Sequence, residues 1–245
     1  MQVVNLLRRT DKKGNNLQRI FIMKSLLVVL FLLLVSVFSV KSQYGSDQLN
    51  IDLQTGDLLF CGSTSGELSK AIDQATQTKQ STHFDHVGIV EIRNDTVWVL
   101  NASPEKGVCC ETISQFISAK KEKITATVYR LKGVYSKNIP EALLKARTLL
   151  GQPYNFTYMI KDKGYYCSEF IYELFAGDSV FTLNPMTFKN PQTGNFLPGW
   201  VDHYQKLGIP IPEGEPGCNP NGVAASDKLV RVGELIVLKP VFIQK

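Results

Sequence analysis

The segment from residue 83 to 102 constrains the fold most, because it has the pattern of a β-hairpin whose register can be worked out. Two runs rich in apolar and β-branched residues, 83–92 and 96–102, flank Arg93-Asn94-Asp95. Asn and Asp tolerate the positive φ angles that two-residue hairpin turns require. We therefore predict two antiparallel strands joined by a tight turn.

The register of this hairpin brings polar side chains together. If Asn94-Asp95 forms the loop, Gly88 opposes Asn101 and His86 opposes Ser103, so these four residues line one face of the sheet. Asn101 becomes the diagonal neighbour of His86, within reach of a hydrogen bond. An odd-numbered loop would place the two residues on opposite faces. Gly88, which lacks a side chain, would leave room beside them for another group to approach.

A second constellation surrounds Cys167. This residue follows a glycine-containing loop and precedes a predicted amphipathic helix, 168–176, that ends at Gly177. The N-terminus of a helix carries a partial positive charge and unpaired N–H groups, which favour the nucleophilic thiolate. We therefore assign Cys167 as nucleophile, His86 as general base and Asn101 as the residue that orients the imidazole. Each residue also has a structural interpretation: a buried core thiol, a strand histidine and a strand-end polar residue.

The rest of the chain predicts an α+β fold in one domain, residues 43–245, with an antiparallel sheet packed against helices. Residues 183–222 are rich in Pro, Gly and Asn and predict long loops around Trp200–Leu207. The expected elements are a strand within 51–61, a helix starting at a Thr64–Glu67 capping box, strands at 83–92, 96–102, 124–131 and 229–242, and helices at 112–121, 140–150 and 168–176.

The order and spacing of four motifs resemble those of the circularly permuted, NlpC-type papain-like cysteine hydrolases of the YiiX/YebB kind. In unpermuted relatives the cysteine helix precedes the histidine strand, whereas here His86 comes first. The motifs are Gly56-Asp-Leu-Leu-Phe60, His86-Val-Gly-Ile-Val90, Gly151-Gln-Pro-Tyr154 and Tyr166-Cys-Ser-Glu-Phe170.

The resemblance implies a permuted papain-like fold and a hydrolase that forms a thiol acyl-enzyme without a cofactor. It also implies a substrate-binding role for Tyr154, whose alternative is a packed aromatic after a helix. In the family the position of Asn101 is often a glutamate. An amide orients the ring but supplies no full charge to stabilise imidazolium, so Asn101→Asp or Asn101→Glu is expected to raise turnover.

The expected substrate is a small peptide, an amide or a lipid-linked acyl group, with peptide or amide bonds of the cell envelope favoured. One alternative function is a catalytically silent peptide- or lipid-binding module, which the Asn101 departure motivates. The other is a lipid acyltransferase or thioesterase, for which water-excluding apolar loops would speak. The candidate loop residues are Phe188, Phe196, Leu197 and Trp200.

Residues 1–42 have the pattern of a targeting segment. An apolar run from Leu26 to Val40 follows Lys24, and translation starting at Met23 would give an ordinary signal peptide. The run is short for a permanent membrane span. We therefore predict an exported, periplasmic or extracellular protein that begins near Gln43 and keeps no membrane span after processing.

The net charge bears on possible partners, and the cysteine count bears on metal sites and disulfides. Seven of the 27 Lys and Arg but only one of the 22 Asp and Glu lie in 1–42, so the remainder has a net charge of −1. No basic patch indicates nucleic acid, and no Cys or His spacing indicates a metal site. With Cys167 as the nucleophile, Cys61, Cys109, Cys110 and Cys218 can pair in three ways or not at all.

Overall fold

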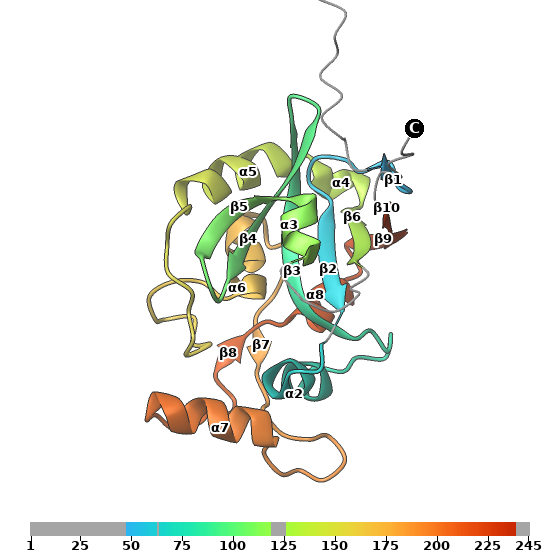
Figure 1. Ribbon diagram of the computed structural model, residues 1–245. Helices are drawn as coiled ribbons and strands as arrows, with labels where there is room; N and C mark the ends of the chain where they lie inside the picture. The colour runs from blue at the N-terminus through green and yellow to red at the C-terminus, as the bar shows by residue number, and fades with distance from the viewer. Residues whose placement is uncertain (1–47, 63, 119–125, 239–245) are drawn as a thin grey trace, which may run out of the picture. The chain divides into compact units, whose positions relative to one another are not determined.

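The computed structural model describes residues 48–62, 64–118 and 126–238 (Figure 1). The chain divides into Met1–Ser46 and Asp47–Lys245, and the described residues all belong to the second unit. The expected targeting segment, 1–42, lies outside them. Within the described residues, no helix combines the length and the apolar character that a membrane span requires.

A six-stranded antiparallel sheet forms the centre of this unit (Figure 1). Its strand order is β5-β4-β3-β2-β6-β9, so neighbours in the sequence are mostly neighbours in space. The strands are β2 (Leu58–Gly62), β3 (Phe84–Arg93), β4 (Thr96–Ser103), β5 (Gly107–Thr112), β6 (Ala126–Leu131) and β9 (Leu229–Leu235). Two further pairs are β1 (Gln48–Leu49) with β10 (Val237–Leu238), and β7 (Asn184–Pro185) with β8 (Pro216–Gly217).

The β3–β4 hairpin has the predicted register. Arg93 pairs with Thr96 and Gly88 pairs with Asn101. The loop is Asn94-Asp95, with φ of +49° and +58°, as a two-residue hairpin turn requires. The prediction that His86 and Asn101 share a face is therefore confirmed.

Strand β5 was not predicted. Its sequence, Gly-Val-Cys-Cys-Glu-Thr, lacks a clear alternation of apolar and polar residues, yet it pairs with β4 from Ser103↔Gly107 to Trp98↔Thr112. Gly107 has a φ of +67°, and a Cβ there would lie 2.2 Å from the backbone oxygen of Gln152. Only glycine fits this turn, which leads the chain into an additional edge strand.

Helices cover both faces of the sheet. α6 (Cys167–Leu174) and α5 (Ile139–Thr148) share the larger core, which includes Phe60 and Ile89. α3 (Ile113–Ser118) covers the opposite face, where Phe116 packs with Val90 and Val99. The remaining helices are α2 (Glu67–Ala75), α4 (Gly133–Ser136), η1 (Ala176–Asp178), α7 (Pro198–Leu207) and α8 (Pro220–Ala224). An antiparallel sheet with packed helices confirms the α+β prediction.

One local prediction was wrong and another was incomplete. The Thr64–Glu67 capping box does not form: Gly66 is the N-cap of α2 and makes no side-chain cap. The loops expected around Trp200–Leu207 are present on both sides of α7, but 183–222 also contain α8 and the β7–β8 pair. α7 lies against α2 (Figure 1), where a Cβ on Gly199 would come within 2.5 Å of the Glu67 backbone oxygen. This close approach, which needs a glycine, is not visible in local sequence patterns.

Candidate active site

Cys167 occupies the first position of α6, as predicted. The N-terminal turn of the helix is fixed because the Tyr166 N–H donates to the Glu169 carboxylate at 3.1 Å, an interaction that satisfies an otherwise unpaired donor. Cys167 is buried. Its Sγ lies 3.9 Å from the backbone oxygen of Asp85, the residue before His86. Helix α6 therefore brings the thiol to the end of β3 that carries the histidine.

His86, Asn101 and Glu111 form a chain of hydrogen bonds across three strands. His86 Nε2 lies 3.1 Å from Asn101 Oδ1, as the hairpin register predicted. Asn101 Nδ2 donates to Glu111 Oε2 at 3.1 Å, and Lys106 Nζ pairs with Glu111 Oε1 at 2.5 Å. Asn101 and Glu111 are both buried. This chain requires the Asn101 amide to turn its oxygen towards the imidazole.

The charge state of Glu111 follows from these contacts. Burial alone would raise the pKa of its carboxyl. Hydrogen bonds from Lys106 and Asn101, together with the charges of Lys106 and His86, instead hold that pKa below the ordinary value. Glu111 is therefore ionised at neutral pH.

Two adjoining cavities meet at the site. Cys167 lines a mainly apolar one together with Met186, Phe188 and Trp200. His86 and Asn101 line the other, which is more polar and includes Ser103 and Glu111. The cavities share four lining residues: Ile72, Asp85, Tyr154 and Tyr158.

Tyr154 lies at this junction. Its hydroxyl is 3.5 Å from that of Tyr158. Burial, followed by the neighbouring Tyr158 and Cys167, raises the pKa of Tyr154 well above its usual value. The hydroxyl therefore stays protonated and can donate a hydrogen bond to a group bound between the cavities.

Gly88 does not open a space for a ligand, contrary to the sequence-based expectation. A Cβ at this position would lie 2.6 Å from Val99 Cγ1 and 3.1 Å from the Phe116 ring and from Asn101 Cβ. The room left by the missing side chain is filled by protein atoms. Gly88 instead lets Phe116 pack closely beside His86, with 5.4 Å between the two ring centroids.

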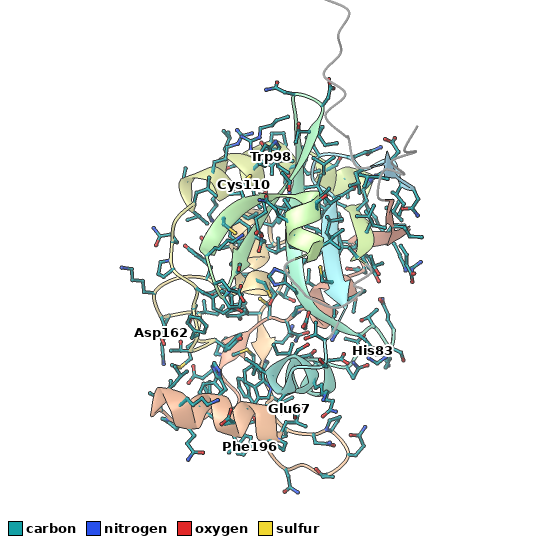
Figure 2. The ribbon with its side chains drawn as sticks, viewed as in Figure 1. Glu67, His83, Trp98, Cys110, Asp162 and Phe196 are labelled. Atoms are coloured by element: carbon teal, nitrogen blue, oxygen red, sulfur yellow. The ribbon has the colours of Figure 1, made fainter. Side chains whose placement is uncertain are left out.

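The other histidines and cysteines lie in different environments. His83 pairs with Asp73 at 3.0 Å in the outer loop before β3 (Figure 2), and His203 contacts the Phe156 backbone oxygen. All five cysteines fall in the described residues, and no two are joined by a disulfide. Burial raises the pKa of both Cys109 and Cys218 to about 12, so neither is a thiolate at neutral pH.

Glu169 is a buried carboxyl that makes stability depend on pH. Burial raises its pKa to about 7, although the Tyr166 N–H and Asn155 hydrogen bonds favour the charged form. A carboxyl with a raised pKa stabilises the fold below its unfolded pKa of about 4.3, and this contribution is lost as pH rises through 7.

Glu169→Gln should therefore stabilise the protein at pH 8, by about 1–3 kcal/mol in the free energy of unfolding, but not at pH 4. Urea denaturation of both proteins at the two pH values measures this difference. An effect of the same size and sign at pH 4 and pH 8 would show that the carboxyl is not titrating.

Glu111 was not among the site residues predicted from the sequence. The signal that could have found it is the turn Ser103-Pro-Glu-Lys-Gly107, which can reverse the chain after β4. A strand continued from that turn pairs Asn101 with Cys109 and places Glu111 diagonally from Asn101 on the same face.

This fold, with the cysteine helix after the histidine strand in the chain, defines the class of permuted papain-like proteins. Residues 52–233 match the model of a family described as "Permuted papain-like amidase enzyme, YaeF/YiiX, C92 family". The chain belongs to this family of cysteine amidases.

Two relatives illustrate the relationship. The chain is 36% identical over 124 residues to the uncharacterized protein YiiX of Escherichia coli K12. The aligned segment covers 50% of this chain and 57% of the relative. The crystal structure of yiiX from Escherichia coli O157:H7 matches with a TM-score of 0.60 and 24% identity. That match covers 74% of this chain and 97% of the other, and supports the shared fold.

Proposed function

We propose that the protein is an exported cysteine hydrolase that cleaves amide or ester bonds through an acyl-enzyme on Cys167. The observation that carries the proposal is the pairing of two features at one site. A cysteine at the N-terminus of α6 contacts the end of β3, and the next residue of β3 is a histidine held by a buried amide. A nucleophile, a base and an orienting group are the parts that acyl transfer needs.

The hydrogen bond to Asn101 fixes which nitrogen of His86 acts. Because Asn101 Oδ1 accepts, Nε2 carries the proton and Nδ1 is the nitrogen that exchanges a proton with the Cys167 thiol. The thiolate attacks the carbonyl carbon, and the imidazolium protonates the leaving amine or alcohol. Water activated by His86 then hydrolyses the thioester and regenerates the thiol.

Donors at the helix start stabilise the tetrahedral intermediate. The backbone N–H of Cys167 belongs to the first turn of α6, where N–H groups have no partner within the helix. The protonated hydroxyl of Tyr154 lies at the junction of the two cavities. We propose that these two donors hold the oxyanion, which places Tyr154 in the substrate-binding site.

The two cavities suit a substrate that has one apolar end and one polar end. The cavity beside Cys167 is lined by Met186, Phe188 and Trp200 and suits an apolar acyl group. The polar cavity beside His86 suits the leaving group. This apolar lining favours the acyltransferase or thioesterase as the second candidate, because both also need an apolar acyl site. Of the loop residues named for it, Phe188, Leu197 and Trp200 are buried in one cluster and Phe196 is exposed.

The described part of the chain offers no cluster of side chains suited to a metal ion. The E. coli O157:H7 relative is described as a metalloprotein. Across 48–62, 64–118 and 126–238 of this chain, no three His, Cys, Asp or Glu side chains gather so that they could hold an ion. The proposed mechanism therefore uses protein groups for every step.

Mass spectrometry of the protein mixed with p-nitrophenyl butyrate tests the proposed chemistry. We expect a butyryl group on Cys167 and continuous release of p-nitrophenol, with N-butyryl p-nitroanilide cleaved more slowly. Addition of an alcohol or amine acceptor distinguishes a transferase, whose product would carry the butyryl group. Tight binding of acyl compounds without any covalent adduct would instead support the silent binding module.

Export is the second part of the proposal, and it rests on the apolar run behind Lys24. Cell fractionation followed by N-terminal sequencing should find a product that begins near Gln43 outside the cytoplasm. A membrane-bound product that keeps residues 1–22 would contradict the predicted processing.

A further inference from the structure

A buried carboxylate, that of Glu111 on β5, lies behind the histidine of the site. Asn101 is neutral, so by itself it cannot offset the charge of a protonated His86. Its amide is completely buried between the imidazole on β3 and Glu111 on β5. Glu111 is 5% exposed, and its carboxylate accepts hydrogen bonds from Asn101 Nδ2 and Lys106 Nζ.

We propose that Glu111 is a positioning residue of the active site, which fixes the orientation of the Asn101 amide and supplies the negative charge that stabilises the His86 imidazolium. The proposal rests on the proposed function, because His86 must cycle between neutral and protonated forms. It makes Asn101 and Glu111 one unit, in which the amide transmits the effect of a carboxylate on the next strand.

The orientation of the Asn101 amide follows from its three hydrogen-bonding neighbours, of which Cys109 Sγ is a weak acceptor for Nδ2 at 3.6 Å. A carboxylate accepts hydrogen bonds and cannot donate, so Glu111 Oε2 selects the Nδ2 end of the amide at 3.1 Å. The Oδ1 end must then face His86 Nε2. Without the carboxylate the amide could turn over, present Nδ2 to the imidazole and favour the wrong tautomer.

The electrostatic effect of the Glu111 carboxylate on the His86 imidazolium follows from distance and burial. Two hydrogen bonds of 3.1 Å separate the Glu111 carboxylate from the ring of His86, and the amide between them excludes water. The counter-charge, Lys106, sits on the solvent side, with its side chain 54% exposed. Water screens Lys106 more strongly than it screens the buried partners, so a net attraction between Glu111 and imidazolium remains.

Exchanging the amide of Asn101 and the carboxylate of Glu111 tests the proposal directly. Asn101→Asp alone puts two carboxylates at hydrogen-bond distance, and like charges so close cannot both ionise without cost. Glu111→Gln alone removes the charge. The double variant Asn101→Asp/Glu111→Gln restores one carboxylate and one amide, in exchanged positions. We therefore expect Asn101→Asp, introduced alone, to destabilise the protein, a cost that opposes the gain in turnover expected from the sequence.

The primary readout is the pKa of His86, followed by NMR of the imidazole signals. The chain has three histidines, and His86→Gln assigns the signal. Glu111→Gln should lower the pKa of His86 by about 0.5–1 unit, and the double variant should return it to the wild-type value or above. The melting temperature should fall in each single variant and recover in the double variant, which defines a coupling between the sites.

The other titrating groups around His86 are not replaced in these variants, although Lys106 and Cys109 lose the neighbouring charge of Glu111 in Glu111→Gln. The groups are Cys61 on β2, Asp85 on β3, Cys109 on β5, Tyr154, Cys167 on α6, and Glu105 and Lys106 in the β4–β5 turn.

Glu91→Gln is the matched control. Glu91 is a buried carboxylate of the same sheet, on β3, and pairs with Arg93 and Arg147 away from both cavities. Its loss should lower the melting temperature and leave the pKa of His86 unchanged. In the unmutated protein, the Asn101 side-chain amide protons should shift as Glu111 titrates in acid, so the test survives even if Glu111→Gln fails to fold.

Two results would overturn the inference. One is a pKa of His86 that does not change in Glu111→Gln, with a loss of stability like that of Glu91→Gln. The other is a double variant whose loss of melting temperature equals the sum of the losses in the two single variants. Because the titration needs no turnover, it separates this inference from the proposed function. Failure of p-nitrophenyl butyrate hydrolysis with a shifted His86 pKa would contradict only the function.

Discussion

Cys167→Ala is expected to lower the rate of p-nitrophenyl butyrate hydrolysis at least ~10³-fold. The substitution removes the atom that would carry the acyl group. Cys61 lies opposite His86 on β2, but it is buried and lines neither cavity, and burial raises the pKa of the Cys109 thiol to about 12. Cys218 lines the apolar cavity beside Cys167, but burial raises the pKa of its thiol to about 12. The fold should persist, because the contact of Cys167 Sγ with the Asp85 backbone oxygen is long, at 3.9 Å, and alanine keeps the helix that starts at this position.

Cys110→Ala is the control for loss of a thiol. Cys110 lies on β5 near Trp98 (Figure 2), where Arg93 Nη2 donates to its Sγ at 3.4 Å. It lines neither of the two cavities at the site, so hydrolysis should be unchanged. If Cys167→Ala retained full activity while correctly folded, the nucleophile would have to be another group.

The largest effect on stability is expected for Arg130→Met. Arg130 on β6 makes a two-pronged ion pair with Asp57, from Nε to Oδ1 at 2.7 Å and from Nη2 to Oδ2 at 2.8 Å. The Asp57 side chain is completely buried. Removal of the arginine leaves a buried carboxylate that keeps, among the described residues, the Gln54 N–H as its donor. We therefore expect a loss of about 3 kcal/mol in the free energy of unfolding.

Urea denaturation of Arg130→Met and of Asp57→Asn/Arg130→Met checks this result. The double variant should be the more stable of the two, because it leaves no unpaired charge. Lys70→Met, which breaks an exposed pair with Glu67, should change stability little. An equal, small effect of Arg130→Met and Lys70→Met would show that the buried pair does not stabilise the fold.

The β3–β4 hairpin shows what the sequence can predict. Its turn residues adopt positive φ, which limits the loop to two residues, and the loop length then fixes every pairing up to Gly88↔Asn101. The hydrogen bond between His86 and Asn101 follows from that register. The helix that begins at Cys167 was accessible from its local apolar pattern. Its end was not, because α6 stops at Leu174 and Gly177 lies within the following η1 (Ala176–Asp178).

Glu111 and the apolar cavity depend on longer-range contacts. Strand β5 pairs through the backbone in spite of a weak pattern, because Gly107 fits against Gln152, a residue from another part of the chain. The cavity beside Cys167 joins α6 to Met186, Phe188 and Trp200. These residues lie in a segment of many prolines and glycines, where periodicity carries little information.

Alkylation by iodoacetamide at pH 6.5, mapped by mass spectrometry, tests the central claim most directly. The claim is that the start of α6 and His86 together activate one thiol among five. We predict that Cys167 reacts faster than Cys61, Cys109, Cys110 and Cys218 in the folded protein, and that His86→Gln removes this advantage. Preferential labelling of any of the other four, with Cys167 unmodified, would contradict the assignment of the nucleophile.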